Sequence, residues 1–378
     1  MGLFLKRTVA ICLLIMGIYA CSKHSAGSGS KTTTDSTTTD TTPARTYRMG
    51  FQLSAPQYNI NLALEALDIW IQRADAAIIC TDVPWDSLLN GETAQQYVID
   101  TYVELAQYYR SKNLKLWVYV DPENGLDRSA DDAALQALGK SIAQPAMQQV
   151  YRRFAFVMDS LLKPDHMGLA LETNLIRGIA PDSIYQGVKQ AANGAYSDIR
   201  AVDAAVKLSV SVQVDYAWGN LAYAGATATY AGVDQDFTDF PFIQELGLSS
   251  YPYLGAESLS SIPANYYSRL VQGRSTPVFV SEGGYTSQSI TGPNGPITSS
   301  PQLQASFIAS QSQWLVQAQA IAVFQLTFTD VDLSSLSSSV AASEKYFATI
   351  GLVDVNLQSK PALSTWDSLF KISIKAGN

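Results

Sequence analysis

Short apolar segments alternate with amphipathic segments along most of the chain. From about residue 46 onward, eight short apolar runs are expected to form buried strands: Met49–Leu53, Ala76–Thr81, Lys115–Val120, Met167–Leu171, Lys207–Val214, Leu246–Ser250, Pro277–Ser281 and Ile321–Thr327. Runs of this length that are apolar at nearly every position are typical of parallel strands covered on both faces. The pattern therefore predicts a buried, mainly parallel sheet.

The segments between these runs have the hydrophobic period of α-helices. Helices are predicted within residues 62–71, 94–111, 134–162, 184–206, 259–271 and 303–318. Strands that alternate with helices indicate right-handed βαβ units. Eight such units predict an α/β protein, closed into a single (β/α)₈ TIM barrel. The residues after the first strand, Gln52–Pro56, lack the glycine fingerprint of a dinucleotide-binding fold, which favours the barrel over an open sheet.

Residues 1–20 have the pattern of an export signal. Lys6 and Arg7 precede an apolar run, Thr8–Ile18, that is too short to span a bilayer. The run ends in Ile18-Tyr19-Ala20-Cys21, which resembles the lipobox of bacterial lipoproteins. The resemblance implies cleavage before Cys21, lipidation of its thiol and a lipid-anchored location in the cell envelope, at the outer membrane or cell surface. An ordinary signal peptide or an uncleaved anchor is the alternative.

The segment from 21 to 45 consists mostly of Ser, Thr, Gly, Lys and Asp. Such a composition buries little apolar surface, so this segment is expected to be a disordered tether. The predicted barrel domain then spans residues 46–378. A hydrophobic content of 47% is ample for its core.

Charge and histidine content exclude several classes of function. The formal net charge is −8, and it becomes −10 once Lys6 and Arg7 leave with the signal. No basic patch is available for nucleic acid. Of the two histidines, only His166 lies in the predicted domain, which argues against Ser-His-Asp catalysis and multi-histidine metal sites. We therefore expect no nucleic-acid partner, no metal and no cofactor.

A lone cysteine and an acidic loop could suggest a nucleophile and a metal site, but each has a simpler structural interpretation. Cys80 ends an apolar run and is expected to be a core residue, not a nucleophile. The loop Asp121–Asp127 gathers oxygen-bearing side chains, but it contains Pro122 and lacks the full ligand spacing of a calcium loop. It is interpreted as a solvated loop that faces the substrate.

Two glutamates directly follow predicted strands. Glu172 comes after Gly168–Leu171, and Glu282 comes after Val278–Ser281. A charged group at such a position is costly to desolvate unless it has a task or a partner. The carboxyl ends of barrel strands meet at one mouth, where barrel enzymes carry their chemistry. Carboxylates about 5 Å apart suit a retaining glycosidase. A structural ion pair is the alternative for either residue.

At these residues the chain resembles glycoside hydrolase clan A, most closely the family 53 type of endo-β-1,4-galactanase. The likeness is carried by Val280–Tyr285, Leu248–Tyr253, Leu116–Pro122, and Gly351–Asp354 followed by Lys360–Ala362 and Trp366. The resemblance implies that Glu282 is the nucleophile and Glu172 the acid/base. It also implies that a tyrosine of the segment Leu248–Tyr253 bonds the nucleophile carboxylate.

The chain departs from the clan at two places. Leu171 stands where the clan usually has the asparagine that precedes the acid/base, and the nearest asparagine is Asn174. The tryptophan that often ends the eighth strand is replaced by Gln325–Phe328. These departures favour a second hypothesis, a non-catalytic glycan-binding lipoprotein on a degenerate barrel. A purely structural surface protein is a third, against which the strand-end glutamates argue.

Aromatic and polar residues at the starts of loops are candidates for binding sugar. Aromatic faces pack on pyranose rings, and polar groups bond hydroxyls. The candidates are Trp85, Trp218, Tyr251, Tyr253, Tyr285, Asn174, Asp121 and Asp215. Each aromatic could instead be a core residue, and each carboxylate a cap or ion pair. The sequence thus predicts a monomeric retaining glycoside hydrolase that acts on a β-linked polysaccharide or oligosaccharide.

Overall fold

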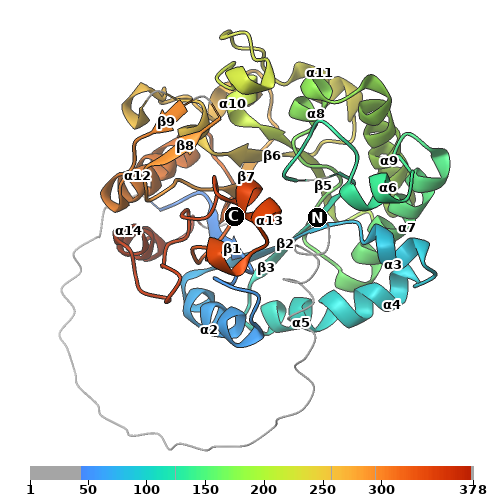
Figure 1. The fold of residues 1–378 in the computed structure, drawn as a ribbon, viewed down its shortest axis with the longest axis horizontal. Helices are drawn as coiled ribbons and strands as arrows, with labels where there is room; N and C mark the ends of the chain where they lie inside the picture. Colours follow the sequence, from blue (N-terminus) through green and yellow to red (C-terminus); the bar gives the residue numbers. More distant parts are fainter. Residues whose placement is uncertain (1–43, 124, 257, 294, 376–378) are drawn as a thin grey trace, which may run out of the picture.

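The computed structural model describes residues 44–375 other than 124, 257 and 294. Eight parallel strands close into a barrel in the order β1-β10-β7-β6-β5-β4-β3-β2, with helices around it (Figure 1). The barrel strands are β1 (Arg48–Gln52), β2 (Ala76–Asp82), β3 (Lys115–Asp121), β4 (His166–Gly168), β5 (Lys207–Gln213), β6 (Glu245–Ser250), β7 (Val278–Gly283) and β10 (Ala322–Gln325). The predicted (β/α)₈ barrel is confirmed. The signal and Cys21 lie outside the described residues.

Helices form in most of the predicted segments and also outside them, and a π-helical turn over Ile99–Val103 divides the segment 94–111. The α-helices are α2 (Ile60–Trp70), α3 (Trp85–Leu89), α4 (Ala94–Val98), α5 (Glu104–Ser111), α6 (Ala133–Ala137), α7 (Pro145–Leu162), α8 (Thr173–Ile179), α9 (Asp182–Arg200), α10 (Val214–Ala217), α11 (Asp234–Asp239), α12 (Pro301–Gln317), α13 (Ser338–Glu344) and α14 (Pro361–Phe370). The helix predicted over 259–271 is wrong: two short 3₁₀ turns form there, Leu259–Ser261 and Ser268–Val271. The segment 134–162 is split after α6, where Gly139 has φ 62°.

Side chains fill the inside of the barrel. Trp117, Tyr119, Phe279 and Phe324 belong to one buried cluster in its interior, and the half-buried Cys80 packs against that cluster. Cys80 is therefore a packing residue, although it is not fully buried. The larger part of the hydrophobic core lies between the strands and the surrounding helices. Since the barrel is packed and not hollow, substrate chemistry has to lie at its mouth.

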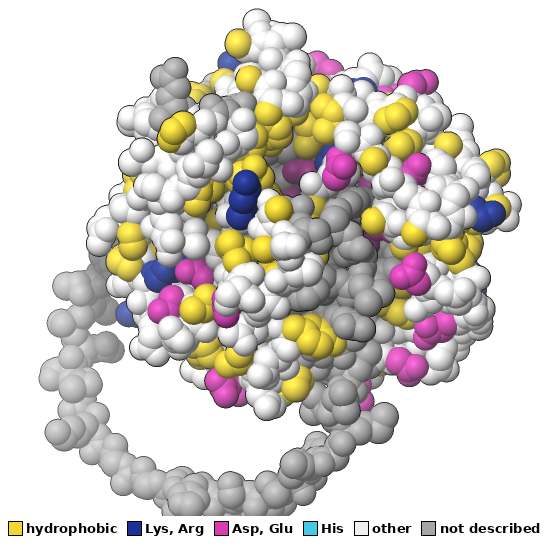
Figure 2. Space-filling model, viewed as in Figure 1, with side chains coloured by type: hydrophobic (Ala, Val, Ile, Leu, Met, Phe, Trp, Pro, Cys, Tyr) yellow, Lys and Arg dark blue, Asp and Glu magenta, His cyan; other side chains and the backbone are white. Residues whose placement is uncertain are grey.

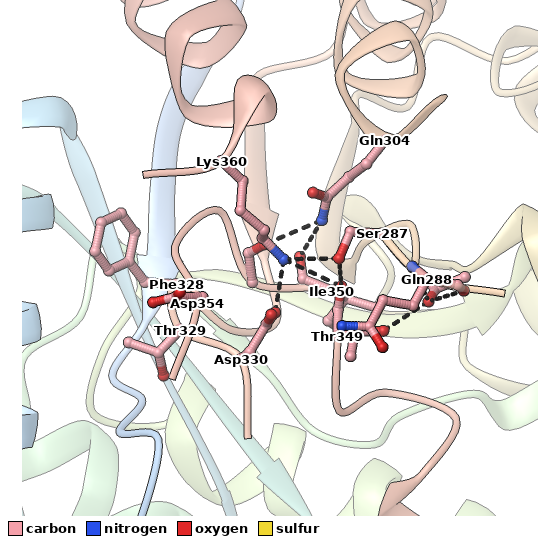
Figure 3. Close-up of polar contacts among 12 residues, drawn as sticks. Ser287, Gln288, Gln304, Phe328, Thr329, Asp330, Thr349, Ile350, Asp354 and Lys360 are labelled. Carbon is pink, nitrogen blue, oxygen red and sulfur yellow. Dashed lines mark hydrogen bonds and ion pairs between the residues drawn. The ribbon is translucent and has the colours of Figure 1, made fainter. Parts of the chain in front are cut away.

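Long segments cover the carboxyl ends of β7 and β10. Lys360 Nζ lies 2.7 Å from Asp330 Oδ1 and donates to Ser287 Oγ at 3.0 Å (Figure 3). Gln304 Nε2 donates to the carbonyls of Ile350 and Gly351, also shown there. These bonds tie the loop after β7 and the loop after β10 to α12 and α14. Within the described part of the chain, no helix is both long and apolar enough to cross a membrane.

Candidate active site

Glu172 and Glu282 lie at one end of the barrel and share a hydrogen-bond partner. Ser249, at the end of β6, places its Oγ 2.5 Å from Glu172 Oε1 and 2.9 Å from Glu282 Oε1. The two carboxylate oxygens are therefore at most 5.4 Å apart, the sum of these two distances. The structure thus brings together the two glutamates that the sequence singled out.

A β-bulge aligns Ser249 with Glu282. Along β6 and β7 the pairing shifts between Leu248 and Ser249, so that Leu248 faces Val280 but Ser249 faces Glu282. The extra residue re-aims the side chains at the end of β7, as bulges next to active sites commonly do. The bulge therefore sets the serine and the glutamate side by side at the mouth.

Glu172 is held in an unusual backbone conformation. Its φ of 49° and ψ of 42° lie in the left-handed region, which costs a residue with a Cβ about 1–2 kcal/mol. β4 ends at Gly168, earlier than predicted, and the chain turns inward before α8 begins. Ser211 Oγ accepts from the Glu172 backbone N–H at 2.9 Å and helps to fix this turn. Strain of this kind, held by neighbours, is often found at functional sites.

Arg128 is a residue of the site that sequence reasoning missed. It comes from the loop between β3 and α6, and its side chain is only 4% exposed. Its Nε lies 2.9 Å from Glu172 Oε2, and its Nη1 lies 2.5 Å from Asp121 Oδ2. An arginine in a loop otherwise rich in acidic residues was the available signal. Asp121 thus lies at the mouth, as predicted, but its carboxylate binds Arg128.

Burial and like charge act on Glu282. Burial, and next the neighbouring charge of Glu172, raise the pKa of Glu282 to about 7, against the lowering effects of Arg128 and Ser249. Burial also raises the pKa of Asp121, although Arg128 opposes this. The Glu282 carboxyl therefore holds a proton near neutral pH more readily than an ordinary glutamate does.

The tyrosines predicted to bind sugar are almost fully buried at the mouth. The ring of Tyr251 packs edge-on against Phe347, with centroids 5.0 Å apart. Tyr253 donates its hydroxyl to the carbonyl of Tyr346, and Tyr285 stacks on Phe307. The resemblance implies that a tyrosine of the segment Leu248–Tyr253 bonds the nucleophile carboxylate; this stays a prediction, and Glu282 Oε1 bonds Ser249. Tyr251 and Tyr253 also pack edge-on against each other, and so do Tyr253 and Tyr285.

Two predicted sugar ligands are buried within the protein, and their contact with sugar stays a prediction. Trp85 is 0% exposed and belongs to the hydrophobic core. Asn174 is also buried, and both ends of its amide bond the backbone of Gln213, at 2.9 Å and 2.8 Å. Position just after a strand does not reveal which way a side chain points. In this fold Asn174 fixes the end of β5.

Trp218 and Asp215 form part of a separate cluster in the loop after β5. Trp218 is half-buried, stacks on Tyr266 and lies under Arg269. Asp215 Oδ1 accepts from the hydroxyl of Tyr266 at 2.7 Å, and burial raises the pKa of Asp215 to about 6. Both residues are thus engaged with Tyr266, and their contact with sugar stays a prediction.

Tyr223 is an exposed aromatic that the sequence analysis did not select. Its side chain is 46% exposed, and its pKa is raised by partial burial and then by the charges of Glu172 and Asp215. Figure 2 shows a hollow on this face, with hydrophobic side chains along its wall and acidic side chains at its base. Among the described residues, no group of three or more His, Cys, Asp or Glu is placed to hold a metal ion.

Solved structures similar to this chain are glycoside hydrolases. An exo-β-1,4-mannosidase from Opitutaceae bacterium strain TAV5 matches 88% of the chain with a TM-score of 0.64 and 13% identity; the chain spans 60% of that protein. The GH53 catalytic domain from Ignisphaera aggregans matches 89% of the chain and 98% of its own, with a TM-score of 0.58 and 14% identity. Xylanase 10B from Thermotoga maritima matches 86% of the chain and 95% of its own, with a TM-score of 0.59 and 11% identity.

No protein-family model and no curated protein sequence matches the chain. At identities of 11–14%, the solved structures establish the fold alone. The chain therefore has the barrel fold that these glycoside hydrolases share, as its sequence motifs indicated. What it does has to be argued from its own side chains.

Proposed function

We propose that this protein is a retaining glycoside hydrolase that acts on a β-linked polysaccharide or oligosaccharide. The observation that carries the proposal is the single hydroxyl of Ser249 in contact with both Glu172 and Glu282, which limits their oxygens to 5.4 Å apart. Retaining glycosidases have carboxyl groups about 5–5.5 Å apart, whereas inverting ones need about 6.5–9.5 Å to admit a water. The fold shared with known glycoside hydrolases is consistent with it.

In this mechanism the two glutamates act in turn. Glu282 attacks the anomeric carbon while the glycosidic C–O bond breaks, and Glu172 gives its proton to the leaving oxygen. Glu172 then removes a proton from water, whose oxygen displaces Glu282 from the sugar. The clan resemblance assigns the two roles. The exposed ring of Tyr223 supplies a face on which a sugar could stack.

The stereochemistry of the product tests this proposal. We expect the protein to cleave one of a panel of β-galactan, β-xylan, β-mannan and aryl β-glycosides, and to release the β-anomer first. Proton NMR of the anomeric region during the first minutes distinguishes β product from the α product of inversion. An α product would overturn the retaining mechanism.

A non-catalytic glycan-binding protein is the second candidate. Two observations favour it: Arg128 occupies one oxygen of Glu172, and Leu171 replaces the asparagine of the clan. Calorimetric titration with the same glycans decides between the two. Binding of a glycan with no release of reducing ends would support the binding protein and exclude the hydrolase.

We also propose that the mature protein is a monomer anchored to the cell envelope by a lipid on Cys21. The lipobox pattern Ile18–Cys21 and the polar segment that follows it support this location. In cells that process lipoproteins, the wild type should fractionate with membranes, and the Cys21→Ser variant should not. Wild-type protein found wholly in the soluble fraction would contradict the proposal.

A further inference from the structure

Ser249 has more carboxylate contacts than its hydroxyl can donate to. A serine hydroxyl has one proton to donate and two lone pairs that accept. Its Oγ nevertheless lies 2.5 Å from Glu172 Oε1 and 2.9 Å from Glu282 Oε1, both within hydrogen-bond range. If both glutamates were ionised, Ser249 could give its one proton fully to only one of them. A second proton, carried by one of the two carboxyls and donated to Ser249, satisfies both contacts.

The other partners of the two glutamates indicate which one carries it. Glu172 Oε2 receives a charge-assisted hydrogen bond from Arg128, which favours the ionised form. Glu282 has no arginine or lysine partner among the described residues. In the free protein Ser249 thus donates to Glu172, while it accepts the proton that Glu282 carries. The raised pKa of Glu282 agrees with this distribution.

Retaining hydrolysis requires the opposite distribution, with a proton on Glu172 and a charge on Glu282. We propose that Ser249 is the positioning residue that holds one shared proton between the two glutamates and passes it from Glu282 to Glu172. The O–H bond of Glu282 breaks as Ser249 Oγ takes that proton, and the original proton of Ser249 bonds to Glu172 Oε1. The pair keeps a charge of −1 throughout. The direction of this transfer, from Glu282 to Glu172, rests on the proposed function. The presence of a shared proton rests only on the contacts of Ser249.

Ser250 provides a matched control for Ser249. Both serines lie in β6 and are fully buried, and each hydroxyl bonds one or more side chains. The Ser250 Oγ lies 2.9 Å from the hydroxyl of Tyr267, and not against either glutamate. Replacement of either serine by alanine removes one buried oxygen, so the two variants carry a similar structural cost.

The test follows the two carboxyls directly. In protein labelled with [δ-¹³C]glutamate, the two signals are assigned with the Glu172→Gln and Glu282→Gln variants and titrated by NMR. In Ser249→Ala, protonated Glu282 loses the acceptor of its proton, so its apparent midpoint should fall by about one pH unit or more. Ser250→Ala should titrate like the wild type. Equal titrations in the wild type and both variants would overturn the shared proton.

Kinetics then test the transfer. With a glycan that the wild type cleaves, Ser249→Ala should lower kcat by about 10–100-fold with little change in KM, and move the acid limb of the pH profile downward. A shifted carboxyl titration with an unchanged kcat would overturn the transfer. If no glycan is cleaved by the wild type, the proposed hydrolase fails, while the NMR titration still decides whether Ser249 holds a shared proton.

Discussion

Replacing Glu282 with alanine is expected to reduce hydrolysis of an aryl β-glycoside by on the order of 10⁴-fold or more, because the covalent intermediate can no longer form. Alanine also opens space beside the anomeric carbon. A small anion such as azide can enter that space and attack in place of the carboxylate. Azide should therefore restore part of the rate for the Glu282→Ala variant.

The product of this rescue identifies the role of each glutamate. Azide that attacks in place of Glu282 approaches from the face opposite the leaving group, so the C–N bond forms as the C–O bond breaks and an α-glycosyl azide results. In Glu172→Ala, the first step still places the sugar on Glu282. Azide then displaces Glu282 and gives a β-glycosyl azide. Proton NMR of the isolated azides distinguishes the two.

Glu245 provides a control at the other end of the same barrel. It is also a buried barrel glutamate, at the start of β6, where its Oε2 bonds His166 Nδ1 at 2.7 Å. Glu245→Gln should keep the wild-type rate and show no effect of azide. If Glu282→Ala hydrolyses as fast as Glu245→Gln, Glu282 is not the nucleophile. If the two azide products are exchanged, the roles of the glutamates are exchanged as well.

The barrel could be predicted from the sequence because its strands are buried on both faces. A strand such as Lys115–Asp121 is apolar at nearly every position and needs no partner to be recognised. Glu172 and Glu282 stand out for the same reason, since each interrupts an apolar run at its end. The mouth then follows from topology alone, because all parallel strands end at one side.

The contacts at the mouth could not be predicted in the same way. Arg128 meets Glu172 across 44 residues of chain, and only the path of the loop after β3 brings them together. Ser249 is an ordinary strand residue until the bulge in β6 and β7 sets it beside Glu282. Trp85 follows a strand, as a residue of the mouth would, yet its side chain is 0% exposed and belongs to the core. The direction in which a side chain points and the path of a loop both depend on tertiary packing, which local sequence patterns do not encode.

Arg128 ought to contribute more to stability than any surface ion pair of this protein. It neutralises two buried carboxylates, Asp121 and Glu172. In Arg128→Met both would be left without a cation, which typically costs about 3–5 kcal/mol. Arg152→Met is the control, because Arg152 pairs with Asp198 at the surface, where each side chain is more than a third exposed. Its loss should cost about 1 kcal/mol or less.

The pH dependence distinguishes an electrostatic loss from a packing loss. In folded Arg128→Met, the buried carboxyls keep protons at pH values where the unfolded chain, whose carboxyls ionise near about pH 4, has lost them. The folded variant then binds more protons than the unfolded one, so its stability falls as pH rises above about 4. Urea unfolding should show the full deficit relative to wild type at pH 7 and a much smaller one near pH 4. An equal deficit at both values would mean that Arg128 acts by packing.

The triple variant Asp121→Asn, Arg128→Met, Glu172→Gln removes every charge of the group, and it should recover most of the lost stability at pH 7 while remaining inactive. Recovery of stability without activity would indicate that the charges at this mouth are kept for chemistry and not for folding.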